Sequence, residues 1–465
     1  MSTSYINLAP YLEVFSDRND WDKPYETFAG EMVYRYKTDD GIFKFYTAVD
    51  ATNFELTQED INEPEGLDFA LDNKNVYSNA SYTGVLSDTW SIRTGGSFTL
   101  SQNGINVQST QIDDTEKSAH LKIKLKKRFS NRLKLNLGVE HFYTDFNEEV
   151  SGSFDTESFN LNYGYKSAIT AAFAESDIIF SRSLALKLGV RAGYTDMLNE
   201  YTISPRASLA LKTGEKSQLS IAYGDFFQNP SSEFLKFTQD FSAQHTQHFI
   251  ANYQYNDNGR IFRAEAYRKE YDNLVTFDTG QATFESTYAN DGSGYAQGID
   301  LFWRDNTSIR NMDYWVSYSF LDSERKYRNY PEQAQPNFVN THNFSVVGKY
   351  FIEDWKSQVG LSYQYGSGRP YTNPNRNGFL QEKTKGFNSL SLNWAYLLSQ
   401  QKILYFSVNN VLGLKNINGY QYADTPNATG NFERRALVPA ADQFFFVGFF
   451  WTISDDNTSN QLDTI

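Results

Sequence analysis

Apolar and polar residues alternate along two stretches of the chain, which read RLKLNLGVEHFY over residues 132–143 and SLALKLGVRAGY over residues 183–194. Successive side chains of a β-strand point to opposite faces of the sheet. Each stretch therefore predicts a strand with one apolar face and one face of charged or small residues. The apolar faces carry Leu133, Leu135, Leu137, Val139, Leu184, Leu186 and Leu188. Alternation alone leaves open whether these side chains contact a protein core or lipid.

The spacing of the predicted turns distinguishes these two environments. Alternating segments predict about 20 strands and no long helix. Short polar turns are expected near residues 39–41, 87–88, 130–131, 182, 214–215, 256–259, 306–308, 353–354 and 400–401. Longer polar connections are expected at residues 53–74, 101–115, 146–165, 195–202, 228–243, 278–288, 322–339, 366–386 and 414–439. Outer-membrane barrels show the same alternation, because their periplasmic turns are short and their extracellular loops are long.

The pattern therefore predicts an all-β fold, a transmembrane antiparallel up-and-down β-barrel over residues 1–453 with a polar C-terminal tail at residues 454–465. The seven apolar residues above are then expected to face lipid. Charged residues within strands are expected to face a polar lumen, because Arg or Lys facing lipid at the bilayer midplane costs about 2–4 kcal/mol. The residues assigned to the lumen are Lys134, Glu140, Lys187, Arg191, Arg263, Glu265, Arg268, Glu270 and Arg304.

Composition agrees with a membrane barrel. The 465 residues include 32 Tyr and 37 Phe, and Tyr and Trp rings favour a membrane–water interface. Aromatic residues near strand ends are expected to form interfacial girdles, among them Phe142, Tyr143, Phe226, Phe227, Tyr314, Trp315, Trp355 and Trp451. A mean hydropathy of −0.57 fits a polar lumen and polar loops, and no apolar run is long enough for a transmembrane helix.

The net charge, the absence of cysteine and the N-terminal residues give further information on the class of protein. The net charge of −14 argues against a nucleic-acid-binding protein, which normally presents a basic face. The absence of cysteine excludes disulfides and thiol chemistry. The first residues, MSTSYINLAPYLEVFSD, show no signal peptide, which suggests a truncation on the N-terminal side of an exported protein.

The chain carries no recognisable catalytic motif. It has no nucleophile elbow, P-loop or dinucleotide fingerprint, so we expect no enzymatic activity, no catalytic residues and no cofactor. His245 and His248 form an HxxH pair, but residues three apart on a strand point to opposite faces, which makes them poor metal ligands. No metal site is therefore predicted.

Two polar connections have the composition of recognition loops. They read RKYRNYPEQAQPNF over residues 325–338 and RPYTNPNRNGF over residues 369–379, and both combine aromatic contact area with hydrogen-bonding groups. The ligand-binding candidates are Arg325, Tyr327, Tyr330, Arg369, Tyr371 and Arg376. Ordinary solvated loops would explain each of these residues taken singly.

Several phrases resemble the barrel of TonB-dependent outer-membrane receptors, the Bacteroidota type in particular. They are ISPRA at residues 203–207, AYGDFFQNP at 222–230, EAYRKEYDNLV at 265–275, GSGYAQGIDL at 292–301, WVSYS at 315–319, THNF at 341–344, SGRPYT at 367–372, VNNVL at 408–412 and GYQY at 419–422. Their order over residues 203–422 carries the resemblance, whereas residues 1–200 resemble the family in pattern only.

The resemblance implies active uptake of a scarce nutrient, such as a metal chelate or an oligosaccharide, across the outer membrane. It implies that the partners are outer-membrane lipid, the ligand, and TonB with ExbB and ExbD, which act through a plug that this chain does not show. The family barrel has 22 strands, so the N-terminal plug and the first hairpin are interpreted as absent. A plug-less passive porin, an adhesive or structural outer-membrane barrel, and a soluble all-β protein are the alternatives.

Overall fold

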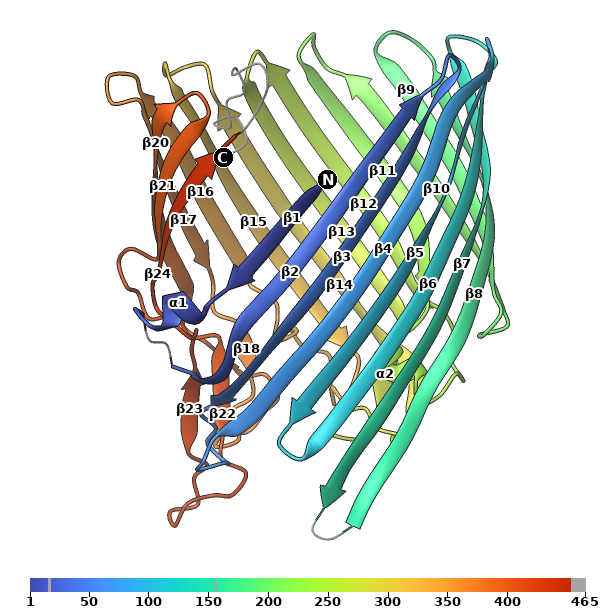
Figure 1. Ribbon diagram of the computed structural model, residues 1–465. Helices are drawn as coiled ribbons and strands as arrows, with labels where there is room; N and C mark the ends of the chain where they lie inside the picture. Colours follow the sequence, from blue (N-terminus) through green and yellow to red (C-terminus); the bar gives the residue numbers. More distant parts are fainter. Residues whose placement is uncertain (16–17, 155–156, 453–465) are drawn as a thin grey trace.

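The computed structural model describes residues 1–15, 18–154 and 157–452. The polar tail predicted at residues 454–465 lies outside the described residues. Most of the described part of the chain is β-strand, and almost none of it is helix (Figure 1). Its two helices, α1 (Ala9–Leu12) and α2 (Ser232–Leu235), have four residues each. No described helix has the length and apolar character needed to cross a membrane.

Twenty strands form one antiparallel sheet, which confirms the predicted fold class and strand number. They are β1 (Ser2–Asn7), β2 (Asp20–Lys37), β3 (Gly41–Gln58), β4 (Leu67–Ser87), β5 (Trp90–Val107), β6 (Thr110–Arg128), β7 (Leu133–Phe154), β8 (Glu157–Ile179), β9 (Leu184–Thr195), β10 (Glu200–Lys212), β11 (Ser217–Gln228), β12 (Gln244–Asp257), β13 (Arg260–Phe277), β14 (Tyr288–Asp305), β15 (Met312–Lys326), β16 (His342–Ile352), β17 (Ser357–Gly366), β20 (Phe387–Ser399), β21 (Lys402–Asn409) and β24 (Phe444–Trp451). Two small hairpins lie in loops: β18 (Pro370–Tyr371) with β19 (Glu382–Lys383), and β22 (Gly419–Tyr422) with β23 (Arg434–Leu437).

The sheet curls into a barrel in which each strand pairs with the strand before and after it in the chain order given above. The first and last strands, β1 and β24, pair only with β2 and β21 within the described residues. The segment around α1 spans part of the interval between them. There Tyr11 packs against Phe444 with ring centroids 5.1 Å apart, and Phe15 stacks on Phe445 at 5.6 Å.

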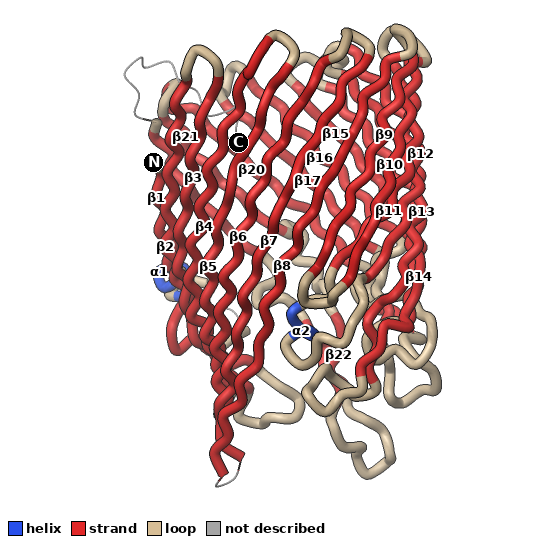
Figure 2. The backbone as a smooth tube through the Cα atoms, turned by 90° about the vertical axis from the view of Figure 1, so that its right-hand side faces the viewer, coloured by secondary structure: helices blue, strands red, loops and turns tan. Residues whose placement is uncertain are grey.

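The short and long connections lie at opposite ends of the barrel (Figure 2). Every short turn expected from the sequence falls between two strands at one end, which we call the short-turn end. The other end, the long-loop end, carries the connections at residues 229–243, 278–287, 327–341, 367–386 and 410–443.

Three of the predicted long loops are mostly strand. The ranges 101–115 and 146–165 belong mainly to the hairpins β5–β6 and β7–β8, which continue beyond the neighbouring strands. The range 53–74 is likewise mostly strand, and half of the range 195–202 belongs to β9 and β10. Polar side chains on both faces of a ladder do not interrupt its backbone hydrogen bonds. A hairpin that leaves the apolar band therefore looks like a loop in composition while remaining a strand in geometry.

The faces of the wall follow the alternation. Leu133, Leu137, Val139 and Leu188 are 39–51% exposed on the outer face, and Leu135, Leu184 and Leu186 share that face while being half-buried. The contact of these side chains with lipid stays a prediction. The inner face is polar, and Asn136 and Glu140 are buried there between their neighbours.

Two face assignments made from the sequence are wrong. Arg268 and Glu270 were placed in the lumen beside Arg263 and Glu265, yet no bulge interrupts β13 between Arg260 and Tyr271, so the two pairs lie on opposite faces. Arg263 and Glu265 line the lumen, whereas Arg268 lies beside the exposed outer residue Phe249. Phe142 and Phe226 likewise face the lumen rather than a lipid girdle, since Phe142 stacks on His120 and Phe226 lines the same recess as His120.

Candidate ligand-binding site

The long-loop end is covered by a layer of loops that contact one another. We call this layer the loop cap and define it as residues 229–243, 278–287, 327–341, 367–386 and 410–443. Its base is a hydrophobic cluster in which Phe234, Leu235 and Phe241 pack against Val275 and Phe277 at the end of β13. Leu235 is 2% exposed, so this loop is anchored to the wall by a dry core.

A polar contact joins two of these loops above the cluster. The Arg328 guanidinium donates to both carboxylate oxygens of Glu233 in α2, at 2.9 and 2.5 Å. The Arg328 backbone also donates to the Val275 carbonyl at 2.6 Å and accepts from Phe277 at 2.9 Å. Residues 229–243 and 327–341 are thereby fixed to the same end of β13.

Three of the six candidates, Arg325, Tyr327 and Tyr330, form one aromatic group. The Arg325 guanidinium lies 4.2 Å from the Tyr271 ring centroid, and its Nε has no hydrogen-bond partner among the described residues. The Tyr327 and Tyr330 rings meet edge to face at 4.8 Å. Burial, together with the hydrogen bond to Tyr330, raises the pKa of Tyr327 to about 12.

The two recognition loops predicted from the sequence meet at this group. The Tyr330 ring contacts Phe379 of the second loop with centroids 4.7 Å apart. Arg369 of the second loop donates from Nε to Asn340 Oδ1 at 3.2 Å. Arg369 also reaches a lumen recess of about 530 Å³ whose charged lining residues are Arg263, Glu265, Asp300 and Arg369.

Tyr371 and Arg376 belong to a second group in the cap. The Tyr371 hydroxyl donates to Glu382 Oε2 at 2.5 Å, and Arg376 Nε donates to Glu382 Oε1 at 2.9 Å. Burial and this hydrogen bond raise the pKa of Tyr371, while the same bond holds the pKa of Glu382 below its usual value. The Tyr371 ring packs on Tyr420 at 4.8 Å.

A third loop, which was not among the predicted recognition loops, completes this group. Arg434 of β23 lies over the Tyr420 ring at 4.4 Å and donates to the Tyr371 hydroxyl at 3.3 Å. Both residues fall in the connection expected at residues 414–439, and the phrase GYQY at residues 419–422 was the available signal. The candidate site is therefore a set of Tyr and Arg side chains from three loops, which offers ring faces and cationic donors at the mouth of the lumen.

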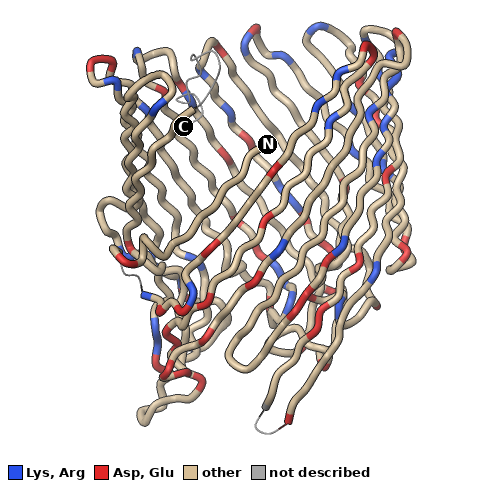
Figure 3. The backbone as a smooth tube through the Cα atoms, in the orientation of Figure 1, with Lys and Arg blue, Asp and Glu red and all other residues tan. Residues whose placement is uncertain are grey.

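Below the cap, charge is concentrated on one side of the lumen wall. Lys122, Lys124, Lys126 and Arg128 occupy alternate positions of β6, on its lumen face, toward the short-turn end. Figure 3 shows Lys and Arg gathered on the strands at the upper right, near this end. Glu140 is 8% exposed and accepts from Lys122 Nζ at 2.8 Å and from Arg191 Nε at 2.7 Å, so it links β6, β7 and β9. A recess of about 820 Å³ opens along this wall.

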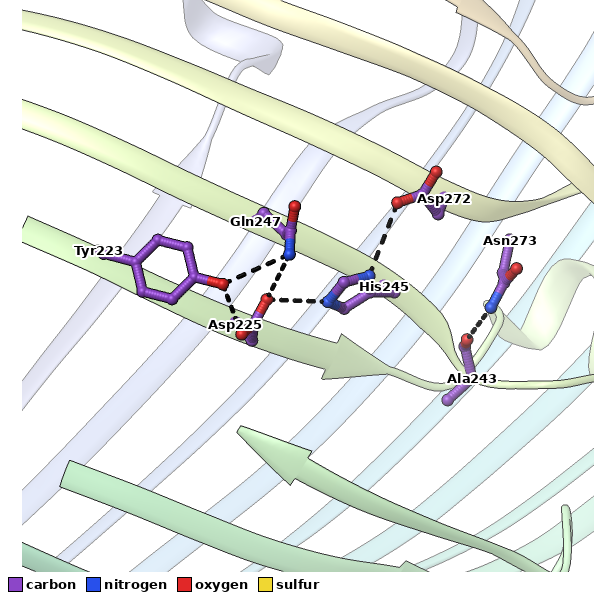
Figure 4. A network of polar contacts seen from close by, with 7 residues as sticks. All are labelled: Tyr223, Asp225, Ala243, His245, Gln247, Asp272 and Asn273. Carbon is purple, nitrogen blue, oxygen red and sulfur yellow. Dashed lines mark hydrogen bonds and ion pairs between the residues drawn. The ribbon is translucent and has the colours of Figure 1, made fainter. Parts of the chain in front are cut away.

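A separate polar network lies on the outer face, near the long-loop ends of β11, β12 and β13 (Figure 4). Asp225 accepts from the Tyr223 hydroxyl at 2.8 Å and from Gln247 at 3.1 Å, and lies 3.1 Å from His245 Nε2. His245 Nδ1 lies 3.6 Å from Asp272. The network marks the level at which the apolar outer band of Leu219 and Ile221 gives way to polar residues.

The two histidines of the HxxH pair lie on opposite faces of β12, as strand geometry requires. His245 belongs to the outer network, whereas His248 lines the large lumen recess and packs against Phe226 at 4.6 Å. Among the described residues, no group of three or more His, Cys, Asp or Glu side chains is arranged to hold a metal ion.

The fold and the site define a class of protein: an up-and-down β-barrel with an apolar outer band, a polar lumen and a cap of long loops at one end. Residues 12–411 match the family model described as TonB dependent receptor-like, beta-barrel. The chain therefore belongs to the barrel family of TonB-dependent receptors, which lie in the outer membrane. No curated protein is significantly similar to the chain in sequence.

Solved structures with the same fold include two uptake receptors and a copper transporter. The ferric yersiniabactin uptake receptor FyuA from Yersinia pestis superposes with a TM-score of 0.74 at 10% identity, over 92% of this chain and 71% of that chain. The copper transporter OprC gives 0.71 at 11% identity, over 96% and 75%. The ferric-catecholate import receptor Fiu from E. coli K12 gives 0.68 at 11% identity, over 93% and 76%. At identities this low, the superpositions show a shared fold and no more.

Proposed function

We propose that this chain is the barrel of a receptor that binds a scarce solute, such as a metal chelate or an oligosaccharide, and imports it across the outer membrane. The observation that carries the proposal is the loop cap of Tyr and Arg side chains above a polar lumen, in a chain of this family. Rigid aromatic side chains supply contact area at low entropic cost, and Arg supplies directed donors. Solved barrels of the same fold include an iron-chelate receptor and a copper transporter.

In this proposal residues 1–453 act as one barrel unit of the Bacteroidota type. Import against a gradient requires energy, which TonB with ExbB and ExbD would supply through a plug. The described residues build the wall and the cap, so contact with TonB would be made by a plug outside them. The barrel would contribute capture at the cap, passage through the lumen, and anchoring in lipid.

The proposal is tested by growth of a deletion strain on iron-poor and on glycan-limited media. We expect a defect on one of these media, restored by the wild-type gene and lost again when TonB is inactivated. Uptake that persists without TonB would indicate a passive porin. Full growth of the deletion strain on both media, together with loss of surface attachment, would indicate an adhesive barrel.

The role of the cap is tested by Tyr371→Ala, which removes the ring packed on Tyr420 and the bond to Glu382. Loss of ring burial and of one hydrogen bond to a charged group is expected to weaken ligand capture about tenfold or more. Phe129→Ala, at a position that is 59% exposed in the short turn between β6 and β7, is the matched control and should leave uptake unchanged. Equal uptake by both variants would contradict a binding role for Tyr371.

A further inference from the structure

The β7–β8 hairpin has a strand edge without a neighbour at the long-loop end. β8 pairs with β7 from Glu157 to Ile178, but it pairs with β9 only from Ile169 to Ile179. Figure 1 shows the part of β8 at this end with β7 on one side and no strand on the other, and Figure 2 shows the hairpin extending past the other strands. We call residues 157–167 of β8 the free edge, which is about 36 Å long at the usual rise of a strand.

The direction of the backbone groups along the free edge follows from Ala168. Its N–H donates to Asp196 Oδ1 at 2.6 Å and its carbonyl accepts from the Asp196 N–H at 3.1 Å, so both groups point away from β7. Backbone groups on a strand alternate in direction from one residue to the next. The N–H and C=O groups of five further residues therefore point to the unpaired side: Ser158, Asn160, Asn162, Gly164 and Lys166. Within the described ranges, these groups have no hydrogen-bond partner.

The loop at residues 229–243 lies beside the free edge but does not bond to its backbone. It contacts β8 on the lumen side, where the Phe237 ring meets Tyr163 at 4.9 Å and Asn229 Nδ2 donates to Ser167 Oγ at 3.3 Å. Proteins protect exposed strand edges with proline or with β-bulges. The free edge has neither, and its pairing with β7 is continuous. It therefore offers a regular row of donors and acceptors to another extended backbone.

The free edge is accessible from water and cannot pair with a second copy of the chain. Tyr143 of β7 lies opposite Ala168, and beyond this pair every outer residue of the described hairpin is polar or Gly. Two copies in one membrane would be related by an axis along the membrane normal. Because barrel strands tilt by about 35–45°, this axis would make the two copies of β8 cross instead of aligning them. A segment of a different protein has no such restriction.

The outer face beside the free edge is acidic. Asp113 of β6 and Glu149 of β7 lie directly opposite each other, are both exposed, and have no ion pair in the described part of the chain. Like charges opposite each other destabilise a sheet. Glu149 also lies opposite Asn162, near the middle of the free edge. A Lys or Arg on a strand paired with β8 would stand on the same face two strands from Glu149, within reach of its carboxylate.

We propose that the free edge docks an extended, basic segment of another protein, which adds to the β7–β8 hairpin as a further strand on the water side of the membrane. Main-chain hydrogen bonds supply the affinity of such strand addition. Asp113 and Glu149 select positive charge on the outer face. Leu161 and Tyr163 lie on the other face of β8 and favour apolar residues between the basic ones. This docking site lies outside the lumen and is independent of the proposed import.

The test measures binding of a fluorescent peptide of Lys-Val repeats to the purified full chain in an uncharged detergent, by fluorescence anisotropy. Wild type is expected to bind this peptide, and to bind a peptide of Glu-Val repeats about tenfold more weakly or less. The double variant Asn160→Pro/Asn162→Pro removes two N–H groups from the unpaired side, where proline leaves the ladder with β7 intact. It is expected to weaken binding of the Lys-Val peptide about tenfold or more.

The matched control is Asn160→Ala/Asn162→Ala, which loses the same two side chains and keeps both N–H groups. It should bind the Lys-Val peptide as wild type does. Each variant is first checked for the folded form by its migration on an unheated gel. Exchange mass spectrometry of wild type gives a second readout that needs no variant. The peptide should slow amide exchange in residues 158–167 and leave residues 184–195 of β9 unchanged.

Three results would overturn the proposal. The first is no binding of the Lys-Val peptide to wild type, or binding that leaves exchange in residues 158–167 unchanged. The second is equal binding by the proline and alanine variants, or equal binding of the two peptides. The third is a wild-type dimer in sedimentation that the proline variant loses, which would assign the free edge to a second copy of the chain.

Discussion

At the scale of single residues, the wall is defined by what each face of a strand can tolerate. Leu188 is 43% exposed on the outer face of β9, and the next residue, Gly189, opens into the lumen recess. A Cβ built on Gly189 would meet Glu175 Cγ at 3.5 Å and Ala174 O at 3.6 Å, which are ordinary contacts. Two adjacent positions therefore offer opposite environments to the same new side chain.

Leu188→Arg is expected to destabilise the folded barrel by about 2–4 kcal/mol if Leu188 faces lipid near the midplane. Gly189→Arg places the same charge in the lumen beside the Glu175 carboxylate and should leave assembly intact. The folded fraction on unheated gels and the urea midpoint of the membrane-inserted protein measure both effects. Equal loss for the two variants would contradict the assignment of faces.

Glu140 is the residue whose removal should disturb the wall most directly. It is buried between Lys122 and Arg191, which are 44% and 22% exposed, so solvent screens part of each interaction. Glu140→Gln is expected to lower the free energy of unfolding by about 1–3 kcal/mol. A double-mutant cycle with Arg191→Gln should show coupling between the two positions, and additive effects would contradict the contact.

At the scale of elements, the loop cap is built to hold its own shape at the end of the barrel. Its loops are joined by the Phe234 cluster, by Arg328 with Glu233, and by the contact between Tyr330 and Phe379. These contacts involve the cap and the last residues of β13 but little of the transmembrane wall. Changes here should affect the cap and leave barrel assembly intact.

Leu235→Ala removes a side chain that is 2% exposed from the core of the loop at residues 229–243. Large-to-small substitution in a packed core costs about 2–5 kcal/mol, which in this case loosens the loop and not the sheet. Limited proteolysis should cut this loop faster while the barrel keeps its heat-modifiable migration. Phe284→Ala, at a position that is 62% exposed, should change neither readout.

Because the pKa of Tyr327 is raised, the stability of the loop cap depends on pH in the alkaline range. The pKa is about 12 in the packed loop against an ordinary value of 10.0, so the packed form holds the proton more tightly than the open form does. The contribution to stability is complete below pH 10.0 and is lost as the pH rises toward about 12. Proteolysis of residues 327–341 should accelerate across this window in wild type. In the Tyr327→Phe variant, the rate of proteolysis should not change as the pH rises from 10.0 to about 12.

At the scale of the whole molecule, the first and last strands of the sheet differ from all the others. β1 and β24 each pair on one side within the described residues, whereas β7 pairs with β6 and β8 along its length. Backbone amides on an unpaired edge open more readily than those in a continuous ladder.

Hydrogen exchange should therefore be faster in Ser2–Asn7 and Phe444–Trp451 than in Leu133–Phe154. The measurement is exchange mass spectrometry on the protein in lipid nanodiscs, with the β7–β8 hairpin as the internal reference. Equal protection of all three segments would mean that both edges are covered, either by each other or by another chain.

The sequence by itself determined the local features of this protein. Strict alternation around Leu137 and Leu188 set the strands and their two faces, because side-chain direction on a strand depends only on position along it. The turn residues near Gly41, Gly214 and Gly259 set the hairpins at the short-turn end. The order of family phrases over residues 203–422 indicated the barrel family, which the match over residues 12–411 shows.

Tertiary structure alone decided which distant residues meet. Nothing near Tyr330 in the sequence indicates Phe379, and nothing near Tyr371 indicates Arg434, because these contacts depend on how loops from different hairpins fold over one lumen. The opposition of Asp113 and Glu149 likewise follows from strand register. The extended hairpins β5–β6 and β7–β8 were predicted as loops for a related reason. Their polar composition indicates contact with water, whereas their strand geometry comes from the backbone pairing of β5 with β6 and of β7 with β8.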